Sequence, residues 1–134
     1  MSPTRREAIE APKAPKPIGP YSVGIRSECF VFSSGMAGLD PASGELVAGG
    51  IGPQTRRTLD NLAAIFEAAG TSMANVVKTT VFLQEMSDFP AMNAVYAEYF
   101  PGDPPARSTV QVAALPKAAL VEIEAIALAA EHGG

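Results

Sequence analysis

Cysteine and histidine are almost absent from this sequence of 134 residues, and tryptophan is missing altogether. The lone Cys29 cannot form a disulfide within the chain, which fits a reducing compartment. One cysteine and one histidine cannot complete a tetrahedral zinc site built from these residue types. His132 lies in a C-terminal Glu-His-Gly-Gly segment, where order is typically low, so no histidine-dependent triad is expected. We interpret Cys29, at the start of an apolar run, as a packing residue rather than a nucleophile.

Basic side chains are outnumbered, with 10 Lys and Arg against 14 Asp and Glu, a formal net charge of −4. A large nucleic-acid-binding surface needs clustered Lys and Arg, so we expect no nucleic-acid partner. No apolar run approaches the roughly 18 residues of a membrane helix. Residues 1–17 also lack the apolar core of a secretory signal, so we expect a cytoplasmic protein that does not associate with membranes.

The common phosphate-binding and nucleophile motifs are missing as well. There is no Walker A motif and no G-x-S-x-G sequence. The Gly-Ile-Gly at 50–52 lacks the third glycine of the dinucleotide fingerprint, so we interpret it as a turn.

What is present is the composition of one globular domain, with 47% hydrophobic and 18% charged residues. Residues 1–17 contain four prolines and mixed charges, and we expect a flexible or extended arm there. The domain itself is predicted over 18–129, followed by a tail at 130–134. No internal repeat divides it.

Hydrophobic periodicity predicts six strands and two helices. The strands are expected at 21–26, 28–34, 46–48, 75–84, 107–114 and 120–128. The first helix is expected to begin at Pro53 and end at Gly70, with an apolar stripe at Leu59, Leu62, Ile65, Phe66 and Ala69. The second is expected at 88–100 with Ser87 as its cap, and its stripe is Phe89, Met92, Val95, Tyr96 and Tyr99.

This order of elements predicts an α+β fold, with one mixed sheet and both helices on one face. Along the last strand, alternation directs Val121, Ile123, Ala125 and Ala127 to one face. Leu120, Glu122, Glu124, Ile126 and Leu128 point to the other face, which is neither cleanly apolar nor cleanly polar. A sheet with one solvated face should alternate more cleanly, so we expect another subunit to cover this far face and predict a homo-oligomer.

Candidate chemistry lies in the last two predicted strands. Glu122 and Glu124 share the far face, and Arg107 begins the strand before theirs. If those two strands pair as a hairpin, Arg107 and the glutamates can approach one site, where an arginine could bind a carboxylate and a glutamate could deprotonate water. Each residue also has an ordinary structural interpretation as a solvated charge or an ion-pair partner. By spacing alone, the sequence assigns none of them a function.

Several motifs occur in an order and spacing that resemble those of the RidA family of reactive intermediate (imine/enamine) deaminases, also called the YjgF or endoribonuclease L-PSP family. The resemblance covers about Pro12 to Leu128, nearly the whole chain. The motifs are IGPYS at 18–22, SG at 34–35, LDP at 39–41 with GE at 44–45, QT at 54–55 with LDN at 59–61, AAG at 68–70, VVKTTV at 76–81, DF at 88–89 with Asn93 and Tyr96, PARS at 105–108, and LP at 115–116 with VEIEA at 121–125.

The resemblance implies a chorismate-mutase-like fold, assembled as a homotrimer with sites in clefts between subunits. It implies hydrolysis of 2-imino acids and their enamine tautomers, such as 2-iminopropanoate and 2-aminoacrylate, to 2-oxo acids and ammonia, without a metal or other cofactor. Arg107 then corresponds to the residue that binds the substrate carboxylate, and Glu122 to the one that positions water. Residues at pocket-lining positions are Tyr21, Ser34, Gly35 and Asn93, and Thr109 matches a strand position whose backbone contacts the ligand.

Some positions differ from the commonest family pattern, including Met36 after Ser-Gly, Val23-Gly24 after Pro-Tyr-Ser, and Thr109. These differences affect the expected pocket wall and therefore the substrate range. A second function stays open, a non-catalytic trimer that binds a small carboxylate such as a 2-oxo acid as a sensor or regulator. A ribonuclease is disfavoured because a catalytic histidine is missing and the net charge is −4.

Overall fold

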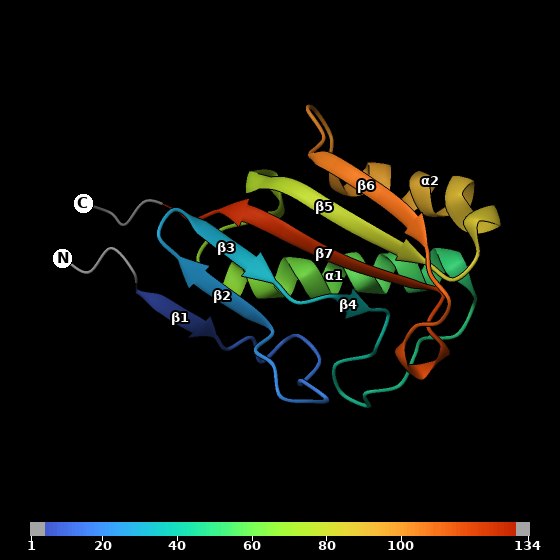
Figure 1. Ribbon diagram of the computed structural model, residues 1–134, viewed down its shortest axis with the longest axis horizontal. Coiled ribbons are helices and arrows are strands. Elements are labelled where there is room, and N and C mark those ends of the chain that lie inside the picture. Colours follow the sequence, from blue (N-terminus) through green and yellow to red (C-terminus); the bar gives the residue numbers. More distant parts are fainter. Residues whose placement is uncertain (1–4, 131–134) are drawn as a thin grey trace.

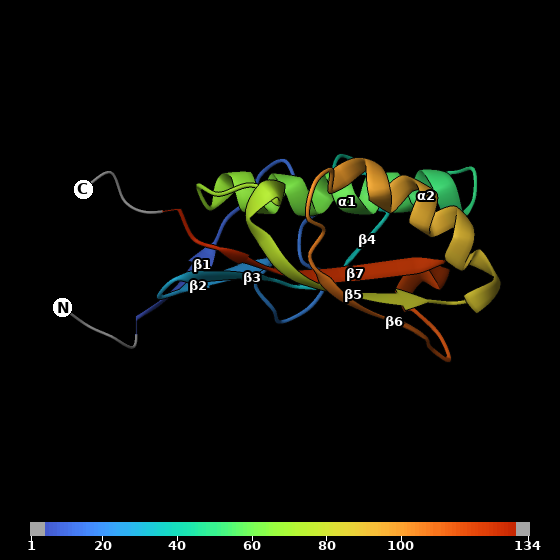
Figure 2. The same ribbon diagram turned by 90° about the horizontal axis from the view of Figure 1, so that it is seen from above.

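The computed structural model describes residues 5–130, which form one seven-stranded mixed sheet with two helices on one face (Figures 1 and 2). The strand order is β1-β2-β3-β7-β5-β6, with the short β4 also paired to β7. Only β5 and β6 are parallel. The strands are β1 Arg6–Ile9, β2 Gly24–Ser27, β3 Phe30–Ser33, β4 Met36–Ala37, β5 Val76–Leu83, β6 Ala106–Gln111 and β7 Val121–Leu128, and the helices are α1 Ile51–Ala68 and α2 Phe89–Tyr99.

Figure 2 shows both helices on one side of the sheet, and the hydrophobic core lies between these two layers. The members of β7 that alternation assigns to the inner face are all buried: Val121, Ile123, Ala125 and Ala127. From α1, the side chains of Leu59, Leu62, Ile65 and Phe66 are fully buried against them. The predicted mixed sheet, with two helices on one face, is confirmed.

Helix α1 begins at Ile51, two residues before the predicted start at Pro53. It ends where the prediction placed the stop, because Gly70 adopts a φ of 83° that side chains other than glycine tolerate poorly. The amide of Gly70 donates to the Glu67 carbonyl, and the amide of Thr71 donates to the Phe66 carbonyl. These bonds satisfy carbonyl groups that the helix end would otherwise leave unpaired.

Two local predictions were wrong. Ser87 does not cap α2, because it lies inside a 3₁₀ turn, η2 Met86–Asp88, and Asp88 occupies the cap position without a side-chain hydrogen bond. The strand predicted at 46–48 is reduced to a single bridge between Leu46 and Leu39. The turn around Asp40 holds this segment instead, with the Asp40 carboxylate accepting from two backbone amides.

The N-terminal segment contributes more than sequence patterns indicated. Within the predicted arm, Arg6–Ile9 forms the edge strand β1, paired antiparallel to β2. Ala14, further along the arm, is buried in the core. At the other end of the chain, His132 and most of the predicted tail lie outside the described residues.

The last two strands do not pair as the hairpin that would bring Arg107 and Glu122 together within one chain. Strand β5 lies between β6 and β7, pairing parallel with the first and antiparallel with the second. The chain passes from β5 through α2 into β6, and then crosses back over residues 112–120 to reach the opposite edge of β5. This crossing includes the 3₁₀ turn η3 Pro116–Ala118, where Lys117 and Ala118 both adopt positive φ.

Within residues 5–130, no helix combines the length and apolarity needed to span a membrane.

Candidate functional site

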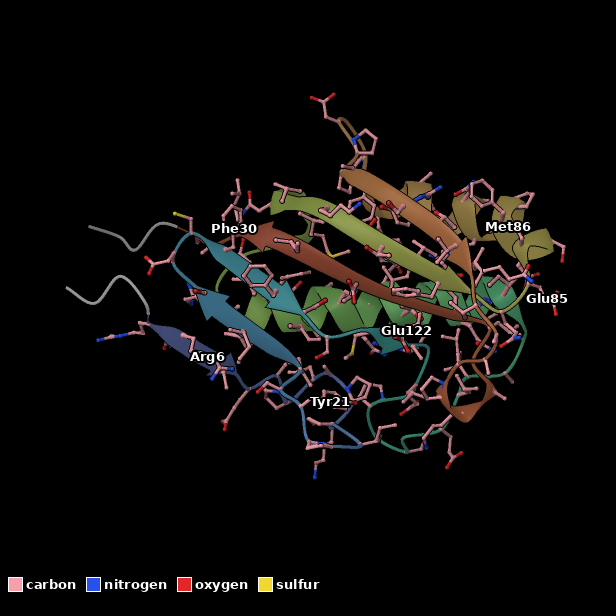
Figure 3. All side chains as sticks on the ribbon, viewed as in Figure 1. Arg6, Tyr21, Phe30, Glu85, Met86 and Glu122 are labelled. Atoms are coloured by element: carbon pink, nitrogen blue, oxygen red, sulfur yellow. The ribbon has the colours of Figure 1, made fainter. Side chains whose placement is uncertain are left out.

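A cleft of about 320 Å³ opens where β4 and the start of β7 meet the loop before β2. Four of the residues predicted from the sequence line it: Tyr21, Ser34, Gly35 and Glu122. Figure 3 shows Tyr21 and Glu122 near each other at this end of the sheet, on the face opposite the helices. The structure therefore brings together four of the seven predicted site residues.

Glu122 is the carboxylate of this cleft, and it is half-buried on the far face of β7. Burial raises the pKa of its carboxyl group above the ordinary value, and the charge of nearby Glu124 raises it further. A carboxylate with a raised pKa is a stronger base, so this group is suited to taking a proton from water.

Gly35 makes room for that carboxylate. A Cβ atom on Gly35 would lie 2.8 Å from Cδ of Glu122 and 3.1 Å from its Cγ, closer than packed atoms normally approach. The neighbouring Ser34 is held in place, because its hydroxyl donates to the Ser22 carbonyl oxygen at 2.5 Å and its amide donates to the Val23 carbonyl. The cleft wall beside Glu122 is therefore shaped by backbone as much as by side chains.

Arg107 lies elsewhere, on the helix-covered side of β6. Its register partner on β5 is Thr79, which is fully buried beneath α2, whereas Glu122 is paired with Phe82 on the same strand. Residues 79 and 82 are three positions apart, so they point to opposite faces. Within one chain, Arg107 and Glu122 therefore face opposite sides of the sheet.

The Arg107 guanidinium lies over two aromatic rings of α2. Its Cζ is 4.7 Å from the ring centroid of Tyr96 and 5.4 Å from that of Phe89. These distances are within the range of favourable cation–π interactions. Burial raises the pKa of the Tyr96 hydroxyl, while its hydrogen bond with Thr79 and the Arg107 charge oppose that shift.

Asn93 and Thr109 lie on the same side of the sheet as Arg107, away from Glu122. Asn93 follows Phe89 by four residues and precedes Tyr96 by three, so all three lie on one side of α2. Its Oδ1 atom is buried and has no hydrogen-bond partner among the described residues. Thr109 is two residues after Arg107 on the same face of β6, opposite Val81 of β5. The predicted site is thus divided into a carboxylate half and an arginine half.

Some residues at the two halves were not predicted. Lys16 and Lys117 line the cleft, and Phe89 and Tyr96 contact Arg107. Met36, which was expected at the pocket wall, also lines the cleft. The two aromatic residues were assigned to the core stripe of the second helix, and their spacing of seven residues was the available signal that both could contact one side chain. Among residues 5–130, no three His, Cys, Asp or Glu side chains are grouped closely enough to hold a metal ion.

The fold and the cleft together define a class of small α+β proteins, in which two helices back a mixed sheet and a glutamate lies in a cleft on the other face. The chain belongs to the endoribonuclease L-PSP family, whose model matches residues 11–129, and this is the RidA (YjgF) family that the motifs indicated. A RutC family protein of Pyrococcus horikoshii is 53% identical over 122 residues, which cover 91% of this chain and 97% of that protein.

Relatives with a named activity are also similar. A 2-iminobutanoate/2-iminopropanoate deaminase of Mus musculus is 49% identical over 128 residues, covering 96% of this chain and 95% of the relative. Among solved structures, the Rid family protein YyfA of Yersinia pestis has a TM-score of 0.90 at 45% identity, covering 92% of this chain and 99% of that one. Escherichia coli TdcF with bound serine has a TM-score of 0.87 at 41% identity, covering 92% and 99%.

Proposed function

We propose that this chain is a cytoplasmic enzyme that hydrolyses 2-imino acids and their enamine tautomers, such as 2-iminopropanoate and 2-aminoacrylate, to 2-oxo acids and ammonia. The observation that carries the proposal is Glu122, a half-buried carboxylate with a raised pKa in a cleft of about 320 Å³. The name of the mouse relative, at 49% identity, supports the same reaction.

The proposed enzyme is a homotrimer whose sites combine residues of two subunits. Arg107 and Glu122 point to opposite faces of one sheet, so a site that uses both needs a second copy of the chain. The far face supplies an apolar surface for this contact, because Phe30, Phe32, Val110 and Leu128 are between 39% and 44% exposed. Large exposed apolar patches typically mark association surfaces. The proposed number of three subunits comes from the family resemblance.

In the proposed site, Arg107 of one subunit binds the substrate carboxylate next to Glu122 of another. The planar guanidinium can donate two parallel hydrogen bonds to the two carboxylate oxygens, which fixes the orientation of the substrate. The imine carbon next to that carboxylate is thereby held at one place in the cleft. Such positioning lowers the activation barrier because the translational and rotational entropy of bringing the reacting atoms together has already been lost on binding.

Glu122 then completes the hydrolysis. A water molecule adds its oxygen to the carbon of the protonated imine, and Glu122 accepts the proton that the water loses. Glu122 next delivers this proton to the amino group of the tetrahedral adduct. The carbon–nitrogen bond breaks, ammonia leaves, and the adduct's hydroxyl gives its proton back to Glu122 as it becomes the carbonyl of the 2-oxo acid.

The test is a coupled assay in which an amino acid oxidase generates the imino acid in solution. If the proposal is correct, adding the chain accelerates release of 2-oxo acid and ammonia above the spontaneous rate. The Glu122→Gln variant serves as the matched control for contaminating activity. A rate equal to that in buffer, with folded oligomeric protein, would show that the chain is not an imine deaminase.

A second candidate is a binding protein without turnover, which holds a small carboxylate as a sensor. The structure of Escherichia coli TdcF with bound serine, 41% identical to this chain, favours this alternative because it contains an amino acid ligand. Saturable binding of 2-oxobutanoate without any acceleration of imine hydrolysis would support the second candidate and exclude the first.

A further inference from the structure

We propose that Tyr96 is a positioning residue that holds Arg107 ready to bind the substrate carboxylate. This inference rests on the proposed function, in which Arg107 is the carboxylate-binding group. Tyr96 does not contact substrate in this scheme. It acts through the guanidinium, which lies over its ring at 4.7 Å from the centroid.

Among residues 5–130, no carboxylate holds the Arg107 side chain. Residues 5–130 form two ion pairs, Arg26 with Glu7 and Arg56 with Glu98, and neither involves Arg107. A partner carboxylate would occupy the N–H groups at the edge of the guanidinium. An aromatic ring instead attracts the cation through its face and does not itself accept hydrogen bonds from the donors in the guanidinium plane.

Tyr96 is fixed well enough to serve as such a support. Its side chain is 6% exposed, and its hydroxyl is hydrogen-bonded to that of Thr79 at 2.7 Å. Its ring also packs against Phe100, with 4.7 Å between the two centroids. A buried side chain held at both its ring and its hydroxyl has little freedom to follow a mobile arginine.

The hydroxyl anchor comes from the strand next to the arginine. Thr79 of β5 is the register partner of Arg107 on β6 and is fully buried. One set of contacts therefore connects β5 to Tyr96 of α2, and Tyr96 to Arg107 of β6. Phe89 adds a second ring at 5.4 Å from the guanidinium, so the cation is held over two rings about two helical turns apart. This arrangement restricts the orientations of Arg107 before any ligand is bound.

The experiment compares the Tyr96→Leu, Tyr96→Phe and Thr79→Val variants of the full chain. The first removes the ring, the second removes only the hydroxyl, and the third removes the anchor while keeping the ring. Tyr99→Leu is the matched control, because Tyr99 is also on α2 but its hydroxyl bonds to Asp60. Calorimetric binding of 2-oxobutanoate, an unreactive product analogue, and the kcat and KM of imine hydrolysis are measured for each variant.

The loss of a cation–π contact predicts that Tyr96→Leu weakens 2-oxobutanoate binding by about 3- to 30-fold and raises KM similarly, with a smaller change in kcat. Tyr96→Phe and Thr79→Val both keep the ring and lose the hydroxyl hydrogen bond, so each should retain binding within about 3-fold. In an Arg107→Lys background, Tyr96→Leu should have little further effect, because its action depends on the guanidinium. Thermal unfolding and oligomer mass are measured for each variant as controls for folding.

Three results would overturn the inference: unchanged binding in a folded Tyr96→Leu variant, an equal loss in Tyr99→Leu, or an undiminished effect of Tyr96→Leu in the Arg107→Lys background. If Tyr96→Leu does not fold, unchanged binding in a folded Tyr96→Met variant, which also lacks the ring, has the same meaning. Failure of the proposed function is distinguishable, because the parent would then bind 2-oxobutanoate in a Tyr96-dependent way without hydrolysing imines. A parent that neither binds nor hydrolyses would overturn both.

Discussion

Gly35 and Glu122 are packed so closely that the glutamate side chain occupies the space where any other residue at position 35 would place its Cβ. That Cβ would lie 2.8 Å from Cδ of Glu122. A side chain at position 35 would therefore displace the Glu122 carboxylate from its present location.

Gly35→Ala should consequently displace the Glu122 carboxylate and lower kcat. A shift of about 1 Å in a reacting group can reduce the rate by about 100-fold, so a loss of roughly 10- to 100-fold is expected. Steady-state kinetics measures it, with Gly52→Ala as the matched control because no atom lies within 4 Å of a Cβ built there. Full activity in Gly35→Ala would mean that this location of Glu122 is unimportant for turnover.

Glu122→Gln should abolish most turnover while preserving binding. The amide has nearly the same shape but is a far weaker base, so kcat should fall by roughly 10²- to 10⁴-fold. Binding of 2-oxobutanoate should remain close to that of the parent. If kcat is unchanged, Glu124 or a backbone carbonyl becomes the next candidate for activating water.

Arg107→Ala should remove ligand binding and nearly all turnover, while the protein stays folded. Arg107→Lys should restore little activity, because an ammonium is a point charge that cannot match both carboxylate oxygens. Binding titrations with 2-oxobutanoate measure the loss, and Arg57→Ala provides a control arginine whose side chain hydrogen-bonds to Asn61 of its own helix. Undiminished turnover in Arg107→Ala would contradict the proposed carboxylate-binding role.

The pH dependence of activity should respond to Glu124. The repulsion between the two carboxylates raises the pKa of Glu122, so Glu124→Gln should lower that pKa. Because a general base works only when ionised, the acidic limb of the pH profile of kcat/KM should move to lower pH. An unchanged acidic limb in the Glu124→Gln variant would show that Glu124 does not influence the ionisation of Glu122.

The same raised pKa has a consequence for stability. Because the pKa of Glu122 is raised, the folded state holds the Glu122 proton more tightly than the unfolded chain does. The protonated Glu122 carboxyl therefore contributes to the free energy of unfolding. This contribution is fully present below the pKa that Glu122 has in the unfolded chain, and it is lost as pH rises through the pKa of Glu122 in the folded state. Urea unfolding at several pH values, compared between the parent and Glu122→Gln, should reveal this difference.

Ile126→Asp should prevent assembly if subunits associate through the far face of the sheet. Ile126 is on that face opposite Phe32, and an unpaired charge buried there would cost on the order of 3–5 kcal/mol. Light scattering should report mainly the 13.9 kDa single chain for this variant and three times that mass for the parent. Ala91→Asp, on the exposed side of α2, should leave assembly unchanged.

Local sequence patterns were sufficient to predict the elements that bury one continuous stripe of apolar side chains. The alternation along 121–128 predicted which residues of β7 face the helices, and the stripe from Leu59 to Phe66 predicted the buried side of α1. These patterns are informative because every second residue, or every third and fourth, meets the same core. Strands β1 and β4 have no such signal, because β1 is a mostly exposed edge strand and β4 contains only two residues.

The amino-acid sequence by itself determined the family, the two amphipathic helices and the identity of Arg107 and Glu122 as candidate site residues. The tertiary structure alone decided that these two residues face opposite sides of the sheet. The reason is that β5 separates β6 from β7, and this strand order depends on a helical crossover between β5 and β6 rather than on a local turn. The sequence of β6 and β7 is equally compatible with a hairpin, in which Arg107 could have approached Glu122 within one chain.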